Sequence, residues 1–279
     1  MSINSRRRSF IRFIQSKRAL SLPITFLLLL TSTLGIISVT YYISVSRLNI
    51  QSETLKASTA EQTFQALNRV ILSTLGQPGS SATFDLTDSG GLTNVQPTNR
   101  VLTINFNDIS GDNETIISSS TGEISYELPN LGSKAIGLYL AGDSQTITNQ
   151  TGASLSQLQI AQGDQGPEIQ LGYRPTVSYA TAALENGKPV NDIRIYVINL
   201  NSSDPISLYG ELPLKISCSN TQLITNTLQV PCQTESLNIN SQIDDASGTI
   251  SVPISNTPQG AIINIETVIS SISIQRSIR

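Results

Sequence analysis

The stretch Lys17-Arg18-Ala19 followed by Leu20–Ser46, LSLPITFLLLLTSTLGIISVTYYISVS, decides how this chain can fold. No charged side chain occurs from Ala19 to Ser46. As a helix rising about 1.5 Å per residue, this run would be roughly 42 Å long, whereas the hydrocarbon core of a bilayer is about 30 Å thick. Residues 19–46 are therefore predicted to form a transmembrane helix.

The charges before this run predict its orientation. Residues 1–18 contain six cations and no anion: Arg6, Arg7, Arg8, Arg12, Lys17 and Arg18. Such an excess is typical of the cytoplasmic side, so residues 1–18 are expected to form a basic cytoplasmic tail or leader. The expected location is the cell membrane, crossed once, with the C-terminal domain extracellular. Membrane lipid is thus the first expected partner.

A retained anchor fits the run better than a cleaved secretory signal does. The apolar stretch exceeds the 7–15 residues typical of a signal-peptide core. It also lacks an Ala-x-Ala cleavage site followed by a clear change to a folded domain.

Two basic residues, a small residue and a long apolar helix resemble the class III signal of archaeal type IV pilin-like proteins. The resemblance rests on Lys17, Arg18, Ala19 and the helix from Leu20. It implies that a prepilin peptidase cuts after Ala19, and that the helix packs against other pilin-like subunits or copies of itself. Ile24 stands where many pilins have Glu at the fifth mature position, which points to a minor or accessory subunit.

Small residues occur in the middle of the predicted span. Thr31 and Gly35 stand four apart, a spacing that lets two helices approach closely. Helix packing through this pair is one interpretation. The other is that small residues are simply tolerated in a single span.

Beyond the span, the helical pattern continues through residues 47–76. Five apolar residues recur at spacings of three and four: Ala57, Ala60, Phe64, Leu67 and Ile71. Such spacing marks one face of a helix, and Gly76 and Pro78-Gly79 would end it. We therefore expect one helix from about residue 22 to 75, transmembrane plus stalk, whose extracellular part packs on the following domain. This arrangement is also similar to that of pilins.

From residue 80 onward the apolar residues no longer follow a helical spacing and instead occur at every second position. Alternating segments predict half-buried strands: Leu102–Phe106, Ile124–Leu128, Ile250–Ile254 and Ile263–Thr267. The segment Ile193–Ile198 is more apolar and is predicted to be a central strand. Turn sequences separate such segments, for example Asn186-Gly187. Residues 80–279 are thus predicted to form an all-β antiparallel, sandwich-like extracellular domain. The polar segment 144–166 is either a long loop or a boundary between two sheets of this domain.

The two cysteines suggest a disulfide. Leu212–Cys218 and Leu228–Cys232 each alternate, and they are predicted to be neighbouring strands with both sulfurs on the apolar side. A Cys218–Cys232 bond is expected outside the cytoplasm, and two buried free thiols are the alternative. No metal site is expected, because two cysteines without any histidine fall short of the usual zinc ligands.

Three sequons lie in the predicted exterior, at Asn113, Asn149 and Asn201. They are candidates for N-glycosylation, although some sequons arise by chance in a chain rich in Asn and Ser.

Composition argues against most chemistry. The net charge is −3 although the first 18 residues carry six cations, so the remainder is acidic and nucleic acid is not an expected partner. Without histidine there is no Ser-His or Cys-His pair, and no Gly-rich phosphate loop precedes a helix. Asp108–Glu114 is rich in oxygen ligands but lacks EF-hand spacing, so it is predicted to be a hairpin turn with solvated carboxylates. Asp244-Asp245 is likewise typical of a turn. No catalytic residue and no cofactor are expected.

The sequence therefore predicts a membrane-anchored extracellular structural or assembly protein of the type IV pilin-like kind, and not an enzyme. The alternative is a single-pass anchored adhesin or ligand-binding β-domain that does not assemble into filaments. Its surface partner is not indicated by the sequence. An enzyme would become the better hypothesis if a pocket held clustered carboxylates with perturbed pKa values.

Overall fold

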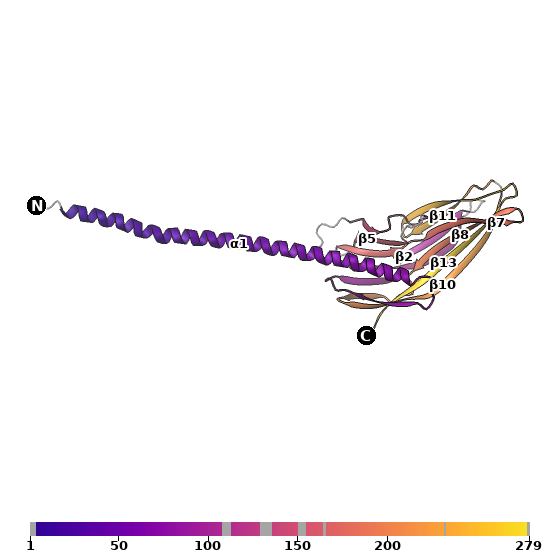
Figure 1. The fold of residues 1–279 in the computed structure, drawn as a ribbon, viewed down its shortest axis with the longest axis horizontal. Coiled ribbons are helices and arrows are strands. Elements are labelled where there is room, and N and C mark those ends of the chain that lie inside the picture. The colour runs from indigo at the N-terminus through magenta and orange to yellow at the C-terminus, as the bar shows by residue number, and fades with distance from the viewer. Residues whose placement is uncertain are drawn as a thin grey trace. The chain divides into compact units, whose positions relative to one another are not determined.

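The computed structural model describes residues 4–107, 113–128, 136–149, 155–163, 166–231 and 233–277, with side chains from Pro23 onward. A single helix, α1 (Asn4–Ser73), precedes thirteen strands in these segments (Figure 1). Two compact units are present, Met1–Thr54 and Leu55–Arg279, and α1 contributes to both. The prediction of a long N-terminal helix followed by an all-β domain is confirmed. The helix already begins at Asn4, within the predicted tail.

The strands vary in length from four to nineteen residues. They are β1 (Ser81–Leu86), β2 (Leu92–Asn107), β3 (Asn113–Glu127), β4 (Leu138–Ala141), β5 (Ser156–Gln162), β6 (Pro167–Tyr173), β7 (Thr176–Glu185), β8 (Lys188–Asn199), β9 (Ile206–Tyr209), β10 (Leu212–Val230), β11 (Ser236–Ile243), β12 (Ala246–Pro253) and β13 (Ala261–Arg276).

These strands form two sheets. The five-stranded sheet has the order β1-β10-β13-β8-β7. The eight-stranded sheet has the order β12-β11-β2-β3-β6-β5-β4, and β9 pairs with β2. Nearly all neighbours are antiparallel, as predicted, but β13 and β8 are parallel. Parallel neighbours need a long connection, and here the chain runs through β9 to β12 before β13 returns beside β8.

The period-two pattern is confirmed where it was most regular. In β2, Leu102, Ile104 and Phe106 are buried while their neighbours are less so. The segment Ile193–Ile198 lies inside the five-stranded sheet, between β13 and β7. It is nevertheless buried mainly on one face, because Arg194 and Tyr196 are exposed.

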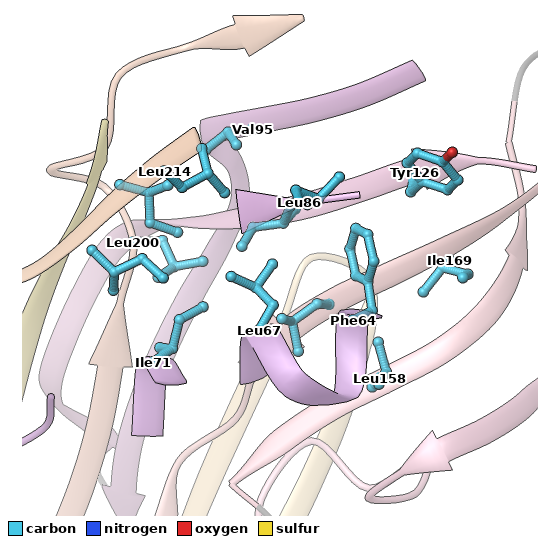
Figure 2. Close-up of a cluster of buried hydrophobic side chains, with 14 of the residues drawn as sticks. Phe64, Leu67, Ile71, Leu86, Val95, Tyr126, Leu158, Ile169, Leu200 and Leu214 are labelled. Atoms are coloured by element: carbon cyan, nitrogen blue, oxygen red, sulfur yellow. The ribbon is translucent and has the colours of Figure 1, made fainter. Parts of the chain in front are cut away.

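Two apolar clusters fill the Leu55–Arg279 unit. The first surrounds the end of α1, and the second lies between the distal parts of the two sheets, around Phe106, Ile195 and Ile239. Figure 2 shows the first cluster, where Phe64 and Ile71 of α1 lie among side chains of the strands.

The segment 144–166 is not one long loop. It contains β5, which pairs along its length with β6 and buries Leu158 and Ile160 completely. The strand was missed because its outward positions carry Gln157 and Gln159, which hid an alternation that is present in the sequence.

Two predicted turns are observed and one lies outside the described residues. Asn186 and Gly187, with φ of 50° and 81°, join β7 to β8 as a tight hairpin. Asp244-Asp245 joins β11 to β12. The Asp108–Glu114 cluster falls almost entirely outside the described residues, except that β3 begins at Asn113.

The predicted setting of the disulfide is wrong. Leu212–Cys218 and the residues up to Val230 belong to one continuous strand, β10, rather than to two neighbouring strands. Twelve residues of extended chain separate Cys218 from Val230, about 40 Å at 3.3 Å per residue, far beyond the ~6 Å between bridged Cα atoms. Cys218 is a buried free thiol, whose sulfur lies 3.8 Å from the Thr221 hydroxyl. Cys232 itself lies outside the described residues.

Candidate functional site

The Met1–Thr54 unit exposes its large apolar side chains over the part whose side chains are described. From Ile24 to Ile50, every large apolar side chain is exposed, ranging from 37% for Val45 to 75% for Tyr42. Exposure of this surface to water is unfavourable, because burying one leucine-sized side chain stabilises by roughly 1.5–3 kcal/mol. The segment is therefore better suited to an apolar surrounding than to water.

The region Pro23–Ser73 is, by length and composition, the one described helix that is long and apolar enough to cross a membrane.

Four hydroxyl groups in the middle of this segment are hydrogen-bonded within the helix. Thr31 and Thr33 donate their hydroxyls to the carbonyls of Leu28 and Leu29, at 3.0 and 2.7 Å. Ser32 and Ser38 do the same one turn back. These four hydroxyl donors therefore keep a partner even where water is absent, as a helix in lipid requires.

The predicted helix-packing pair, Thr31 and Gly35, lies on an exposed part of the helix surface. A methyl group placed on Gly35 would find nothing within 4 Å, and Thr31 is exposed on the same helix. Helix packing at this pair stays a prediction.

The processing residues Lys17, Arg18, Ala19 and Leu20 lie in α1. Their side chains are outside the part that the structure describes, so cleavage after Ala19 stays a prediction.

The end of α1 is buried in the β-domain. The five residues of the predicted stripe, from Ala57 to Ile71, are all 3% exposed or less. Phe64 packs against Tyr126, with ring centroids 5.8 Å apart and planes tilted by 48°. The stripe prediction is confirmed residue by residue.

One buried polar network sets how this end of the helix docks. Asn68 donates from Nδ2 to the Ser156 hydroxyl at 2.9 Å, and the Tyr173 hydroxyl donates to Asn68 Oδ1 at 3.1 Å. Burial raises the pKa of Tyr173, which keeps the phenol a neutral donor. Because a rotation or a slide of the helix would break both bonds, the network fixes its position on β5 and β6.

The sequons are described only in part. Asn149 is exposed, but Thr151 lies outside the described residues, as does the side chain of Asn113. Asn201 is exposed in the turn after β8, whereas Ser203 is buried, donates to the carbonyl of Ile272 at 3.4 Å and accepts from the Ile274 amide at 3.1 Å. Because Ser203 is held inside the fold, glycosylation of Asn201 would have to precede folding.

A polar pocket of about 430 Å³ lies on the eight-stranded sheet. Its lining is mostly amide and charged side chains: Asn99, Arg100, Glu123, Gln157, Gln159, Gln170, Gly172, Ile243, Asp244, Asp245 and Ala246. On β5 these side chains alternate with the core residues Leu158 and Ile160, so the pocket opens on the outer face of the sheet.

Local backbone features build the pocket. The β2–β3 pairing jumps from Gln96 to Arg100, and this bulge brings Asn99 and Arg100 to its wall. A Cβ on Gly172 would overlap the Arg100 guanidinium, so the glycine makes room for it. Asp244 accepts the Val101 amide hydrogen bond at 2.8 Å and thereby holds the β11–β12 turn against β2.

The charges in the pocket are unequal in exposure. Glu123 is 9% exposed, and burial raises the pKa of its carboxyl although Asn99 donates a hydrogen bond to it and Arg100 is near. Arg100 in turn donates to Gln157 at 3.1 Å and lies 3.8 Å from Asp244. The result is a dense set of donors and acceptors suited to a ligand that carries many polar groups.

No group of three or more His, Cys, Asp or Glu side chains in the described segments could hold a metal ion. Sequence reasoning missed the pocket because its walls come from β2, β3, β5, β6 and the β11–β12 turn. The available signal was the row of outward-facing glutamines on β5 and β6.

Beside the pocket, a buried arginine ties a loop to the sheet. Arg174 is fully buried at its side chain and pairs with the Asp143 carboxylate. It also donates to the carbonyl of Gln145 at 2.9 Å, and Gln157 donates to that carbonyl at 3.0 Å. The hydrogen bond from Arg174 lowers the pKa of Asp143. These contacts hold residues 143–145 in place and are structural.

The fold and sites define a β-sandwich-like domain that carries an exposed apolar N-terminal helix. Comparison of the chain with protein-family models, with curated proteins and with solved structures finds no match in any of the three.

Proposed function

We propose that this protein is a membrane-anchored extracellular assembly protein of the archaeal type IV pilin-like kind, acting as a minor or accessory subunit. One observation carries the proposal. Within the single helix α1, all large apolar side chains from Ile24 to Ile50 are exposed, while the stripe from Ala57 to Ile71 is buried in the β-domain. The first segment is thus suited to an apolar surrounding, such as lipid or other apolar helices.

The mechanism is physical rather than catalytic. Cations before Ala19 keep the N-terminus in the cytoplasm, and the uncharged run from Leu20 holds the chain in the bilayer. Cleavage after Ala19 removes the basic leader and frees the apolar helix for bundling. Thr31 and Gly35 supply a close-approach surface for that bundle, while the β-domain faces outwards.

Mass spectrometry of the N-terminal peptide, on protein from native membranes, tests this proposal. A mature start at Leu20 is the expected result. An intact basic tail, in cells whose other pilins are processed, would overturn the proposed assembly.

A matched pair of variants sharpens the test. Arg18→Gln should reduce processing, because it removes a basic residue next to the cleavage site. Arg12→Gln removes the same charge six residues upstream and should leave processing unchanged.

A second candidate function is a ligand-binding domain on the same anchor, and the polar pocket favours it. Calorimetric titration of the full chain with neutral and charged oligosaccharides would test it, since these ligands offer many hydroxyls. Arg100→Ala should abolish any binding at the pocket, whereas Asn238→Ala, on an exposed position of β11, should not. Equal loss in both variants would show that the pocket is not the binding site.

A further inference from the structure

The five-stranded sheet has a long unpaired edge. Strand β10 pairs with β13 along almost its whole length, but β1 covers only Leu212–Ser217 on the other side. No described strand pairs with the free side of residues 219–230. Figure 1 shows β7, β8, β13 and β10 following one another across this sheet. Every second N–H and C=O along the free side of β10 thus points away from the sheet.

This edge lacks the usual protection against pairing. Natural edge strands are blunted by Lys, by Pro or by being very short. Residues 219–230 contain no charged residue and no proline, and Leu223 is 59% exposed on the strand. The nearest charge on β10, Lys215, lies in the half that β1 covers.

The opposite border of the same sheet has matching properties. Strand β7 pairs only with β8, apart from one bridge between Thr176 and Thr148. Residues 177–184 carry no charge and no proline, and they expose Leu184 by 67% and Tyr179 by 46%. The two borders are therefore electrostatically compatible, because no charge on either would be desolvated or repelled.

A cavity of about 320 Å³ lies between the two sheets and reaches the free half of β10. Gln222 and Ile224 of β10 line it together with residues of β13, β8, β3 and β2. A strand added to β10 would direct every second side chain to this inner side of the sheet. Main-chain hydrogen bonds to the open edge, with alternate side chains in such a space, are how an extended segment joins a sheet.

We propose that the free half of β10 pairs with β7 of a second copy of this chain. Strand β10 is antiparallel to β13, β13 is parallel to β8, and β8 is antiparallel to β7, so β10 and β7 run in the same direction. A translated copy can therefore continue the sheet through a parallel β10–β7 pair. The contact uses two different edges, so it repeats from copy to copy.

The strand register places residues of β7 and of the free half of β10 in the same row across the sheet. Ser178 of β7 is opposite Arg194, Arg194 is opposite Glu266, and Glu266 is opposite Thr225 of β10. Ser178 and Thr225 are both exposed and share the outer face of the sheet.

Such an edge contact is small compared with a standard interface of about 1,600 Å², so it needs a high local concentration. Anchoring copies in one membrane would provide this, and in that sense the inference rests on the proposed function.

Thiol cross-linking of the full chain in lipid vesicles tests the pairing. Ser178→Cys and Thr225→Cys chains are mixed, treated with bismaleimides of several lengths, and the linked peptides are identified by mass spectrometry. Links between residues 178 and 225 of two chains are expected. Links between two 225 positions would instead show antiparallel β10–β10 pairing and would overturn the proposal, as would the absence of links at either site.

A charged variant and its control check that the edge itself is responsible. Leu223→Lys should reduce the 178–225 links at least tenfold, with an unchanged melting temperature because the side chain is exposed. Val101→Lys changes a comparably exposed residue on β2, which has neighbours on both sides, and should leave the links unchanged. Equal links in both variants would contradict the edge pairing.

Gly35→Cys separates this inference from the proposed function. Links between Gly35→Cys chains without 178–225 links would leave helix assembly standing and overturn the strand pairing. Links at 178–225 without any at position 35 would leave the strand pairing standing and overturn helix assembly through Gly35.

Discussion

Two segments of helix α1 differ in whether their apolar side chains are exposed or buried. From Pro23 to Ser46 the surface of α1 carries no charge, is apolar nearly all round and is entirely exposed. From Ala57 to Ile71 a single stripe is apolar, and that stripe is completely buried in the β-domain. Backbone conformation is the same in both, so the difference comes only from how apolar residues are distributed around the axis.

This difference shows that periodicity, rather than total hydrophobicity, determines what a helix packs against. A stripe one-third of the circumference wide matches one protein surface, whereas a uniformly apolar helix matches a surrounding that is the same in all directions. The hydroxyls of Thr31 and Ser38, which bond back to their own helix, keep the first segment uniform.

The largest expected effect lies in the buried stripe. Phe64→Ala should lower the free energy of unfolding of the β-domain by about 3–5 kcal/mol, because it leaves a cavity beside Tyr126. Phe26→Ala, in the exposed segment, should leave it unchanged within ~0.5 kcal/mol. Urea unfolding of detergent-solubilised protein measures both. Equal effects would show that the two segments do not differ as described.

The exposed segment should respond to charge instead. Leu29→Asp places a carboxylate at the centre of the span and should cost about 3 kcal/mol of membrane insertion. Ser52→Asp, beyond the uncharged run, is the control and should insert normally. Carbonate extraction of membranes reports the fraction inserted. If Leu29→Asp inserted as well as the control, the span would have to lie elsewhere.

The docking network gives an intermediate effect. Asn68→Ala should cost about 1–3 kcal/mol, because Ser156 and Tyr173 lose their buried partner. Tyr173→Phe should cost less, about 1 kcal/mol, and the double variant should cost less than the sum. A thermodynamic cycle from chemical unfolding tests this coupling. Strict additivity would mean that Asn68 and Tyr173 do not act as one network.

The smallest effect is a pH dependence confined to the β-domain. The carboxyl of Glu123 has a raised pKa in the folded state, so the folded protein binds its proton more tightly than the unfolded chain. Its contribution to stability is therefore present at low pH and falls as pH rises from the ordinary glutamate value through the raised one. Glu123→Gln should remove this slope, whereas Glu235→Gln, at an exposed position, should retain it. Unfolding midpoints between pH 4 and 8 provide the measurement.

Local patterns in the sequence predicted the elements well but not their partners. The spacing from Ala57 to Ile71 gave the buried helix face, since a stripe is a property of neighbouring residues alone. Strand β5 was not predicted because Gln157 and Gln159 face outward and obscure the alternation. The predicted setting of the Cys218–Cys232 bond was wrong because Leu212–Val230 forms one long strand instead of two neighbouring ones. The polar pocket depends on a bulge before Arg100 and on pairing between distant strands, which no local pattern contains.

The position of β13 has a consequence for how the chain is made. It is the last described strand in chain order, yet it lies between β10 and β8, in the interior of its sheet. While the chain is being synthesised, β8 and β10 have no strand between them until the residues up to Arg276 have emerged. Helix α1 can form long before that moment, whereas the five-stranded sheet can close only afterwards. This sheet therefore stays unfinished for most of the synthesis time.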